Sequence, residues 1–274
     1  MITQFFKHLL MVVPALMLNF LASAQKVAGN KQLGKKVINK VRVDGKLTEW
    51  DKPLAAYNSS TEIFYTVAND ADNLYFAIQP KDMVIVKKII AGGITITLNN
   101  AGKKGFGGVS VTFPLIAGNS QTRIGLLLSE PPMASDSAGK KRQTDSLTRL
   151  LNSEFNRLAK EIKVTGVSTI PDLMLSVYND TGIKAAANFD DKHMLTYEVA
   201  VPLKYLEFLQ PGQSAFHYQI MLNGLDSVFK PVTHNTAQGP IVVRTVPRGI
   251  GGDISSGSVI SFPTDFWAEY TLVK

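Results

Sequence analysis

Short runs in which apolar and polar side chains alternate recur along most of this chain. Ile94, Ile96 and Leu98, for example, alternate with Thr95 and Thr97. Successive side chains of a β-strand point to opposite faces, so the pattern predicts strands with one dry and one wet face. Further candidate strands are residues 63–68, 74–78, 109–113, 173–178, 183–188, 194–201, 216–222 and 266–273. Roughly ten short strands with mostly short turns predict an all-β fold, an antiparallel β-sandwich, rather than a parallel sheet with helical crossovers.

Two segments show helical spacing instead. Asp82 is placed to cap a short helix that runs through Ile89 and ends at Gly92 and Gly93. A longer amphipathic helix is expected to follow Asp145 or Ser146, because apolar residues then recur every three or four positions: Leu147, Leu150, Leu151, Phe155, Leu158 and Ile162. The sandwich is therefore expected to carry one inserted amphipathic helix and one short helix. Residues 130–144 and 234–257, rich in Gly, Pro and polar residues, are expected to be surface loops.

The first 24 residues have the features of a secretory signal peptide. Lys7 precedes an apolar stretch, and Ala22, Ser23 and Ala24 supply the small residues that a signal peptidase requires. Pro14 interrupts the stretch, which is too short for a membrane span, and no later segment is long and apolar enough. We therefore expect export to the periplasm or the extracellular space, with no transmembrane segment after cleavage. The chain has no cysteine, which excludes disulfides, thiolate metal sites and a cysteine nucleophile.

The positive charge of this chain is concentrated near its beginning. The whole sequence has 29 Lys and Arg against 22 Asp and Glu, a net charge of +7. Residues 25–46 carry six of these charges, and residues 47–274 hold 21 charges of each sign. Residues 25–40 are therefore expected to be a basic, flexible tether, followed by the sandwich at 41–274. A balanced sandwich lacks the basic face that a phosphate backbone requires, so a nucleic-acid partner is not expected.

Four blocks of sequence resemble family 9 carbohydrate-binding modules, which are common in exported bacterial proteins. The blocks are residues 43–50 (VDGKLTEW), residues 65–76 with Asp82, residues 197–203 (YEVAVPL) and residues 263–267 (PTDFW). The resemblance implies a β-sandwich that binds carbohydrate, in the best-known members by clamping a terminal sugar between two Trp side chains. It also implies calcium ions that brace the loops. A cell-envelope glycan is the expected partner.

The candidate ligand-binding residues are aromatic, because an aromatic ring packs on the apolar face of a sugar. They are Tyr57, Phe106, Tyr178, Tyr205, Trp50 and Trp267. Both tryptophans are also explained by core packing, since Trp50 ends the first block and Trp267 lies in an alternating strand. Two exposed rings on either side of a polar cleft would favour sugar binding. The candidate calcium ligands are Asp70, Asp72, Asn73 and Asp82, although a polar hairpin turn uses the same residue types.

No arrangement of residues identifies a catalytic site. Glu49, Glu62, Glu198 and Asp190 or Asp191 are carboxylates that a glycosidase could use, but Glu198 is expected on the exposed face of its strand. The sequence contains no nucleophile elbow and no metal-binding histidine spacing. The sequence therefore predicts an exported, non-catalytic glycan-binding protein. The alternative is a structural or protein-interaction module of the cell envelope that has lost sugar binding.

Overall fold

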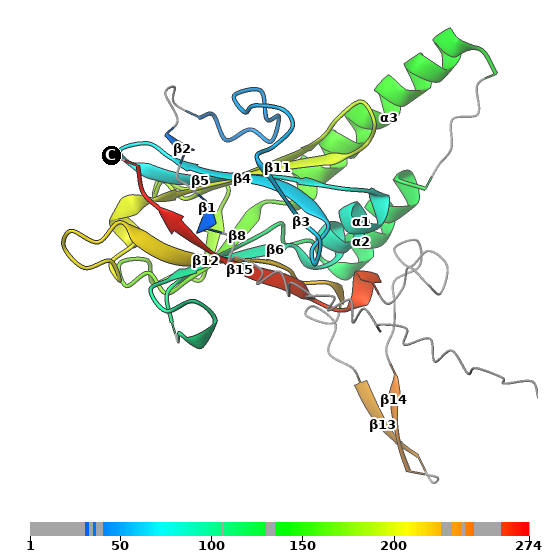
Figure 1. Cartoon of the computed structure of the whole chain (residues 1–274). Helices are drawn as coiled ribbons and strands as arrows, with labels where there is room; N and C mark the ends of the chain where they lie inside the picture. The colour runs from blue at the N-terminus through cyan, green and yellow to red at the C-terminus, as the bar shows by residue number, and fades with distance from the viewer. Residues whose placement is uncertain are drawn as a thin grey trace, which may run out of the picture.

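The computed structural model describes residues 31–32, 35–36, 41–105, 107–129, 135–225, 232–236, 239–243 and 259–273. Two sheets face each other in two layers, as Figure 1 shows, so the predicted β-sandwich is confirmed. The strand pairings in both sheets are antiparallel, except for the two-residue strands β1 and β2, which pair in parallel with β15 and β4. The region expected to be the signal peptide lies outside the described residues.

Sheet A has seven strands. Their order is β1 (Lys31–Gln32), β15 (Thr264–Thr271), β12 (Ala215–Leu222), β6 (Ile94–Asn99), β7 (Val109–Phe113), β8 (Glu161–Thr165) and β9 (Met174–Ser176). Most of its strands alternate between buried and partly exposed residues, as the sequence pattern predicts. The expected strands at 94–98, 109–113, 173–178, 216–222 and 266–273 all belong to this sheet. A short 3-10 helix, η1 (Gly102–Lys104), lies between β6 and β7.

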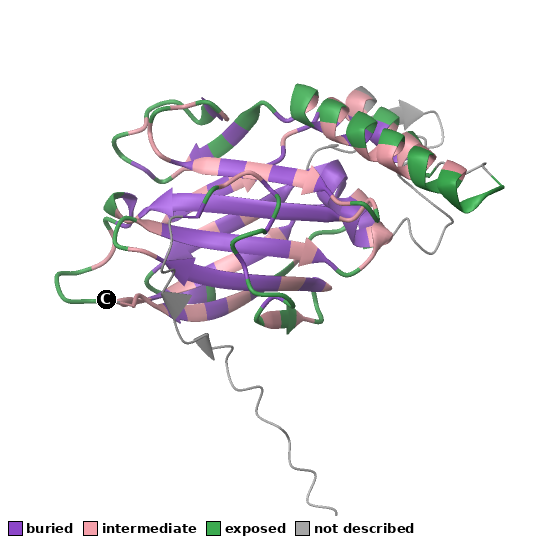
Figure 2. Ribbon diagram, turned by 90° about the horizontal axis from the view of Figure 1, so that it is seen from above, coloured by how far each residue is buried: buried purple, intermediate pink, exposed green. Residues whose placement is uncertain are grey.

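Sheet B has six strands. Their order is β10 (Lys184–Phe189), β11 (Leu195–Pro202), β5 (Asn73–Pro80), β4 (Ile63–Asn69) and β2 (Lys35–Lys36), with β3 (Ala56–Asn58) also pairing with β4. Figure 2 looks onto this layer and shows strands that are buried along most of their length. All eight residues of β11 are buried. The two faces of sheet B are therefore both covered, one by sheet A and the other by residues 41–55.

One apolar core fills the space between the sheets. Alternate residues of β4, β5, β10 and β11 face those of β6, β7, β12 and β15, with Tyr65, Phe76 and Tyr218 among the large side chains. A second, smaller cluster lies on the outer side of sheet B, where Leu47, Trp50 and other residues of the covering segment pack on it. Among the residues that the structure describes, the outward side chains of sheet A are partly exposed along most of its strands.

Tyr197 lies in the main core with its hydroxyl unpaired. The side chain is fully buried, and its hydroxyl has no hydrogen-bond partner in the described part of the chain. A buried unpaired hydroxyl costs free energy, so we expect Tyr197→Phe to raise the free energy of unfolding by about 1 kcal/mol. Tyr205→Phe is the matched control, because the Tyr205 hydroxyl donates to the Thr181 carbonyl at 2.8 Å. The free energy of unfolding of Tyr205→Phe should fall by about 1 kcal/mol. Urea unfolding measures the free energy of unfolding of both variants. A Tyr197→Phe variant less stable than the wild type would show that the Tyr197 hydroxyl does have a hydrogen-bond partner.

Helix α1 (Met83–Gly92) agrees with the short helix expected after Asp82. The Asp82 carboxylate accepts hydrogen bonds from the main-chain N–H groups of Val84 and Ile85, and the helix is followed by Gly93 with a φ of 76°. Lys88 on this helix is fully buried. Its Nζ donates to Thr264 Oγ1 at 2.9 Å, and no carboxylate of the described residues lies within ion-pair distance of it. This buried cation makes the end of the sandwich near α1 sensitive to pH.

The longer helix begins earlier than expected. Helix α3 (Ser137–Leu158) starts after Asp136, whose carboxylate accepts a hydrogen bond from the Gly139 N–H at 2.7 Å. Residues 137–144, expected in a loop, are therefore helical, and Figure 1 shows this end of α3 projecting beyond the sheets. Ile162, expected on the helix, instead lies in β8. Helix α2 (Gly118–Leu127), which packs between α1 and α3, was not predicted.

Helix α3 also covers one edge of sheet B. Asn152 Nδ2 donates to the Phe189 carbonyl at 2.9 Å, and Asn152 Oδ1 accepts from the Phe189 N–H at 2.7 Å. Because β10 is the last strand on this side, the amide satisfies main-chain groups that would otherwise face an absent neighbour.

The remaining described segments are short. Strands β13 (Val232–Thr236) and β14 (Gly239–Val243) form a separate hairpin, so part of the loop expected at 234–257 is strand, and the rest lies outside the described residues. Strands β1 and β2 fall within the expected tether at 25–40. A 3-10 turn, η2 (Leu203–Tyr205), follows β11. None of the described helices has the length and apolar character that crossing a membrane requires.

Candidate functional site

Residues 41–55 are fastened to sheet B by one buried carboxylate. Glu198 on β11 is 1% exposed, and its Oε1 accepts a hydrogen bond from Trp50 Nε1 at 2.7 Å. Its Oε2 accepts from the main-chain N–H groups of Asp44 and Gly45 at 2.9 and 2.7 Å. The expectation that Glu198 faces solvent is therefore wrong, because the covering segment buries this side of the strand. Glu198 acts as a structural anchor and is not presented to a substrate.

The geometry at Gly45 requires glycine. Its φ of 79° is unfavourable for other residues, and a Cβ there would lie 2.6 Å from the carbonyl carbon of Ala187. Burial raises the pKa of Glu198, while the N–H groups of Trp50, Gly45 and Asp44 oppose part of that rise. The first and third blocks of the family resemblance thus meet in one hydrogen-bonded cluster. These motif residues hold the fold together, and Trp50, which is 8% exposed, offers no free ring face to a ligand.

The candidate calcium ligands do not converge. Asp70 Oδ1 accepts from the main-chain N–H groups of Asp72 and Asn73, and Asp70 Oδ2 accepts from the Tyr75 hydroxyl at 2.6 Å. Burial raises the pKa of Asp70, but these hydrogen bonds outweigh it and hold the pKa below its usual value. Asp82 lies at the other end of β5, capping α1. The described residues contain no group of three or more acidic, histidine or cysteine side chains that could hold a metal ion.

The tyrosine and phenylalanine candidates are scattered. Tyr57 is 43% exposed on β3 and packs against Phe64, with ring centroids 4.9 Å apart. Tyr178 is 77% exposed and lies between β9 and β10, at the opposite edge of the sandwich. Tyr205 is buried, and Phe106 lies outside the described residues. The two exposed rings among these candidates therefore do not face each other across a cleft.

Trp267 has a different position from Trp50. It lies on β15 between Phe266 and Ala268, which are both buried in the core, so its indole points to the outer side of sheet A. There it is half-buried, and within the described ranges no side-chain hydrogen bond or aromatic ring contact involves it. We name this surface the polar face and define it by the outward side chains of five strands: Asp265, Trp267, Met221, Gln219, Thr95, Thr97, Thr112, Ser110, Lys163 and Thr165.

The strand register arranges these side chains in rows. One row crosses five strands from β15 to β8 and consists of Trp267, Gln219, Thr97, Ser110 and Thr165. Within it, Ser110 Oγ donates to Thr97 Oγ1 at 3.0 Å. Gln219 Nε2 donates to Asp265 Oδ2 at 2.7 Å, which fixes an amide and a carboxylate beside the indole. The row combines one aromatic surface with a line of hydrogen-bonding groups.

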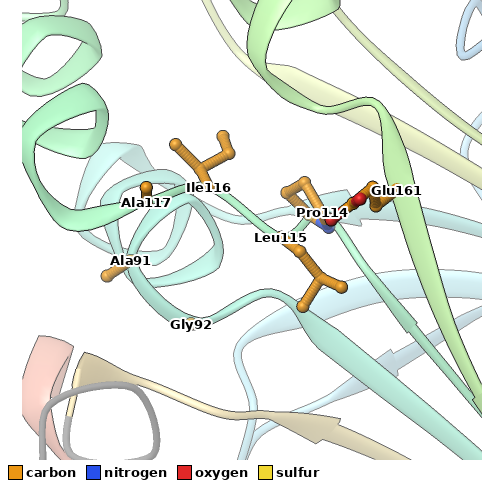
Figure 3. A pocket seen from close by; sticks show the side chains of 7 residues that line it. All are labelled: Ala91, Gly92, Pro114, Leu115, Ile116, Ala117 and Glu161. Carbon is orange, nitrogen blue, oxygen red and sulfur yellow. The ribbon is translucent and has the colours of Figure 1, made fainter. Parts of the chain in front are cut away.

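A pocket of about 290 Å³ lies where α1 meets sheet A. Figure 3 shows Glu161 next to Pro114 at one side of it, with Ala91 and Ala117 at the other. Gly92, Leu115 and Ile116 complete the lining. A second pocket, of about 480 Å³, lies beside the Asp70 turn, where the carboxylate oxygens are already bonded to the protein. Glu161 in the first pocket differs from Asp70 in the second, because its carboxylate makes no hydrogen bond or ion pair in the described part of the chain.

A scan against models of protein families finds no match, and a search of curated proteins finds none either.

Sequence reasoning missed several residues of the polar face. Gln219, Asp265 and Lys163 are not among the candidates, nor is Glu161 of the pocket, although alternation in 216–222 already assigns Gln219 to the wet side of its strand. The sequence does not show which strands are neighbours in the sheet, because strand register depends on pairings between residues far apart in the sequence.

Proposed function

We propose that this protein is an exported, non-catalytic glycan-binding β-sandwich protein whose binding surface is the polar face. One observation carries the proposal: Trp267 presents a half-buried indole beside Gln219 and Asp265 on a sheet face whose other outward side chains, apart from Met221, are polar. An indole face packs on the C–H groups of a pyranose ring, while amide and carboxylate groups bond its hydroxyls. The resemblance to family 9 carbohydrate-binding modules supports the same class of ligand.

The location of the site differs from what the resemblance implies. A clamp of two tryptophans is not available, because Trp50 is buried between its own segment and sheet B, and Trp267 lies on the other layer. A single ring on an open sheet suits a glycan that lies along the surface. The hydroxyl groups of Thr97 and Ser110 continue the surface away from the indole.

Trp267→Ala is expected to weaken oligosaccharide binding about tenfold, because it removes the stacking surface. Tyr57→Ala is the matched control, since it removes an exposed ring from the edge of sheet B. A glycan array identifies ligands, and calorimetric titration with and without Ca²⁺ measures both variants. Gln219→Ala, which keeps the indole, should give a smaller loss. If the wild type and Trp267→Ala bound oligosaccharides with equal affinity, the polar face would not be the binding surface.

The alternative is a structural or protein-interaction module of the cell envelope. It is favoured by the exposed apolar side chains of Leu173 and Met174 at the outer edge of sheet A, which are 56% and 43% exposed. Absence of binding to every glycan, in either calcium condition, would favour this alternative.

A further inference from the structure

The pocket beside Glu161 is a continuation of the polar face. Lys163 on β8 pairs with Thr112 on β7, and both side chains point outward. Side chains two positions along a strand share a face, so Glu161 points outward like Lys163, and Pro114 directly follows the last residue of β7 at the same end of the sheet. Glu161 and Pro114 both line the pocket, as Figure 3 shows. A ligand on the polar face can therefore enter the pocket without crossing a strand edge.

The lining of the pocket combines two kinds of group. The Glu161 side chain is exposed and unengaged by the described residues, so it is available to accept a hydrogen bond. The rest of the lining is apolar: Pro114 and Leu115 lie near Glu161, and Ala91 lies on the opposite side. A ligand group that fits both has an N–H donor next to a methyl group, and the acetamido group of an N-acetylated amino sugar has this composition.

We propose that the pocket binds the N-acetyl group of an amino sugar within a chain, another unit of which stacks on Trp267. This inference rests on the proposed function and adds the sugar class. From Trp267 on β15 to Pro114 just after β7, the ligand crosses three strand spacings and shifts four residues along the strands, so the span is about 20 Å. Since a hexose unit of an extended chain repeats at about the spacing of neighbouring strands, the two contacts lie about four sugars apart.

The experiment compares two series of oligosaccharides of equal length, N-acetylglucosamine oligomers and glucose oligomers, by calorimetric titration. Dimers are too short to reach both contacts, so the two dimers should bind alike. The acetylated pentamer should bind about tenfold more tightly than the glucose pentamer. Ala117→Phe should abolish this preference, because Ala117 is exposed at the rim of the pocket and a larger side chain there fills it. The same variant should leave the affinity for the glucose pentamer unchanged.

Ala55→Phe is the matched control, because Ala55 is an exposed alanine on the segment that covers sheet B, and it should change neither affinity. Glu161→Ala, on an exposed strand position, is a second variant that should reduce the preference. Equal binding of the two pentamers, with Trp267→Ala still weakening both, would overturn this inference and leave the proposed function standing. Failure of every oligomer to bind would instead overturn the proposed function.

Discussion

Glu198→Ala should lower the free energy of unfolding by about 3 kcal/mol, because it leaves buried N–H donors without an acceptor. The donors are Trp50 Nε1 and the main-chain N–H groups of Asp44 and Gly45. The loss should be concentrated in residues 41–55, which would detach from sheet B before the core between the sheets opens. Urea unfolding gives the total change, and hydrogen exchange of the segment shows where it arises.

Two further variants make the test specific. Trp50→Phe removes one of the three hydrogen bonds and keeps an aromatic ring, so we expect a loss of about 1 kcal/mol. Glu49→Gln alters an exposed carboxylate in the same motif and should change the stability by less than about 0.5 kcal/mol. If Glu198→Ala were as stable as the wild type, the carboxylate would not be the anchor of this segment.

Lys88→Met is expected to stabilise the protein at pH 7 by about 2 kcal/mol and to have little effect above pH 10. Burial lowers the pKa of Lys88 to about 8, with nearby Glu62 opposing part of the change. Because the ordinary lysine value is 10.5, the unfolded chain binds more protons than the folded chain between these two values. The stability contributed by Lys88 therefore rises with pH from about 8 to 10.5 and is least favourable below 8.

The comparison with Lys87→Met isolates this effect. Lys87 neighbours Lys88 on α1, but its Nζ bonds to Ser129 Oγ at an exposed position. Urea midpoints of the two variants and the wild type are measured at pH 7 and at pH 10.5. They separate the effect of the buried Lys88 charge on stability from the effect of pH on the rest of the protein. A Lys88→Met protein that is less stable than wild type at pH 7 would show that the Thr264 hydroxyl compensates fully for the buried charge.

The strands of sheet A were predictable because one of their faces is wet. Alternation in 94–98 and 216–222 reports that geometry directly. β8 was missed because Ile162 continues the apolar spacing of the preceding helix, so a change of period within a few residues was hidden. The early start of α3 was missed for a different reason. Its first turns, which include Lys140 and Lys141, are polar and project from the sheets, so no apolar stripe marks them.

The candidate site was less predictable than the fold. The exposed position assigned to Glu198 assumed that solvent lies on the other side of an alternating strand, and residues 41–55 break that assumption. For Trp267 the sequence left two positions open, because its alternation with Phe266 and Ala268 is compatible with either face until the core is known. The neighbours of Trp267 come from β12, β6 and β7, which no local pattern could assign. The first and third sequence blocks therefore located the anchor of the fold, and the fourth block contains Asp265 and Trp267 of the polar face without indicating their neighbours.

The hydrogen bonds between Asn152 and Phe189 bear on how readily this protein aggregates. An uncovered outer strand can recruit the same strand of another copy, and repeated recruitment builds fibrils. At the Phe189 end of β10 such recruitment would first have to displace α3, whose Leu151 and Phe155 are buried in the core. We therefore expect the Asn152 amide to hinder edge-to-edge pairing at this end of the strand, in addition to its role in the fold.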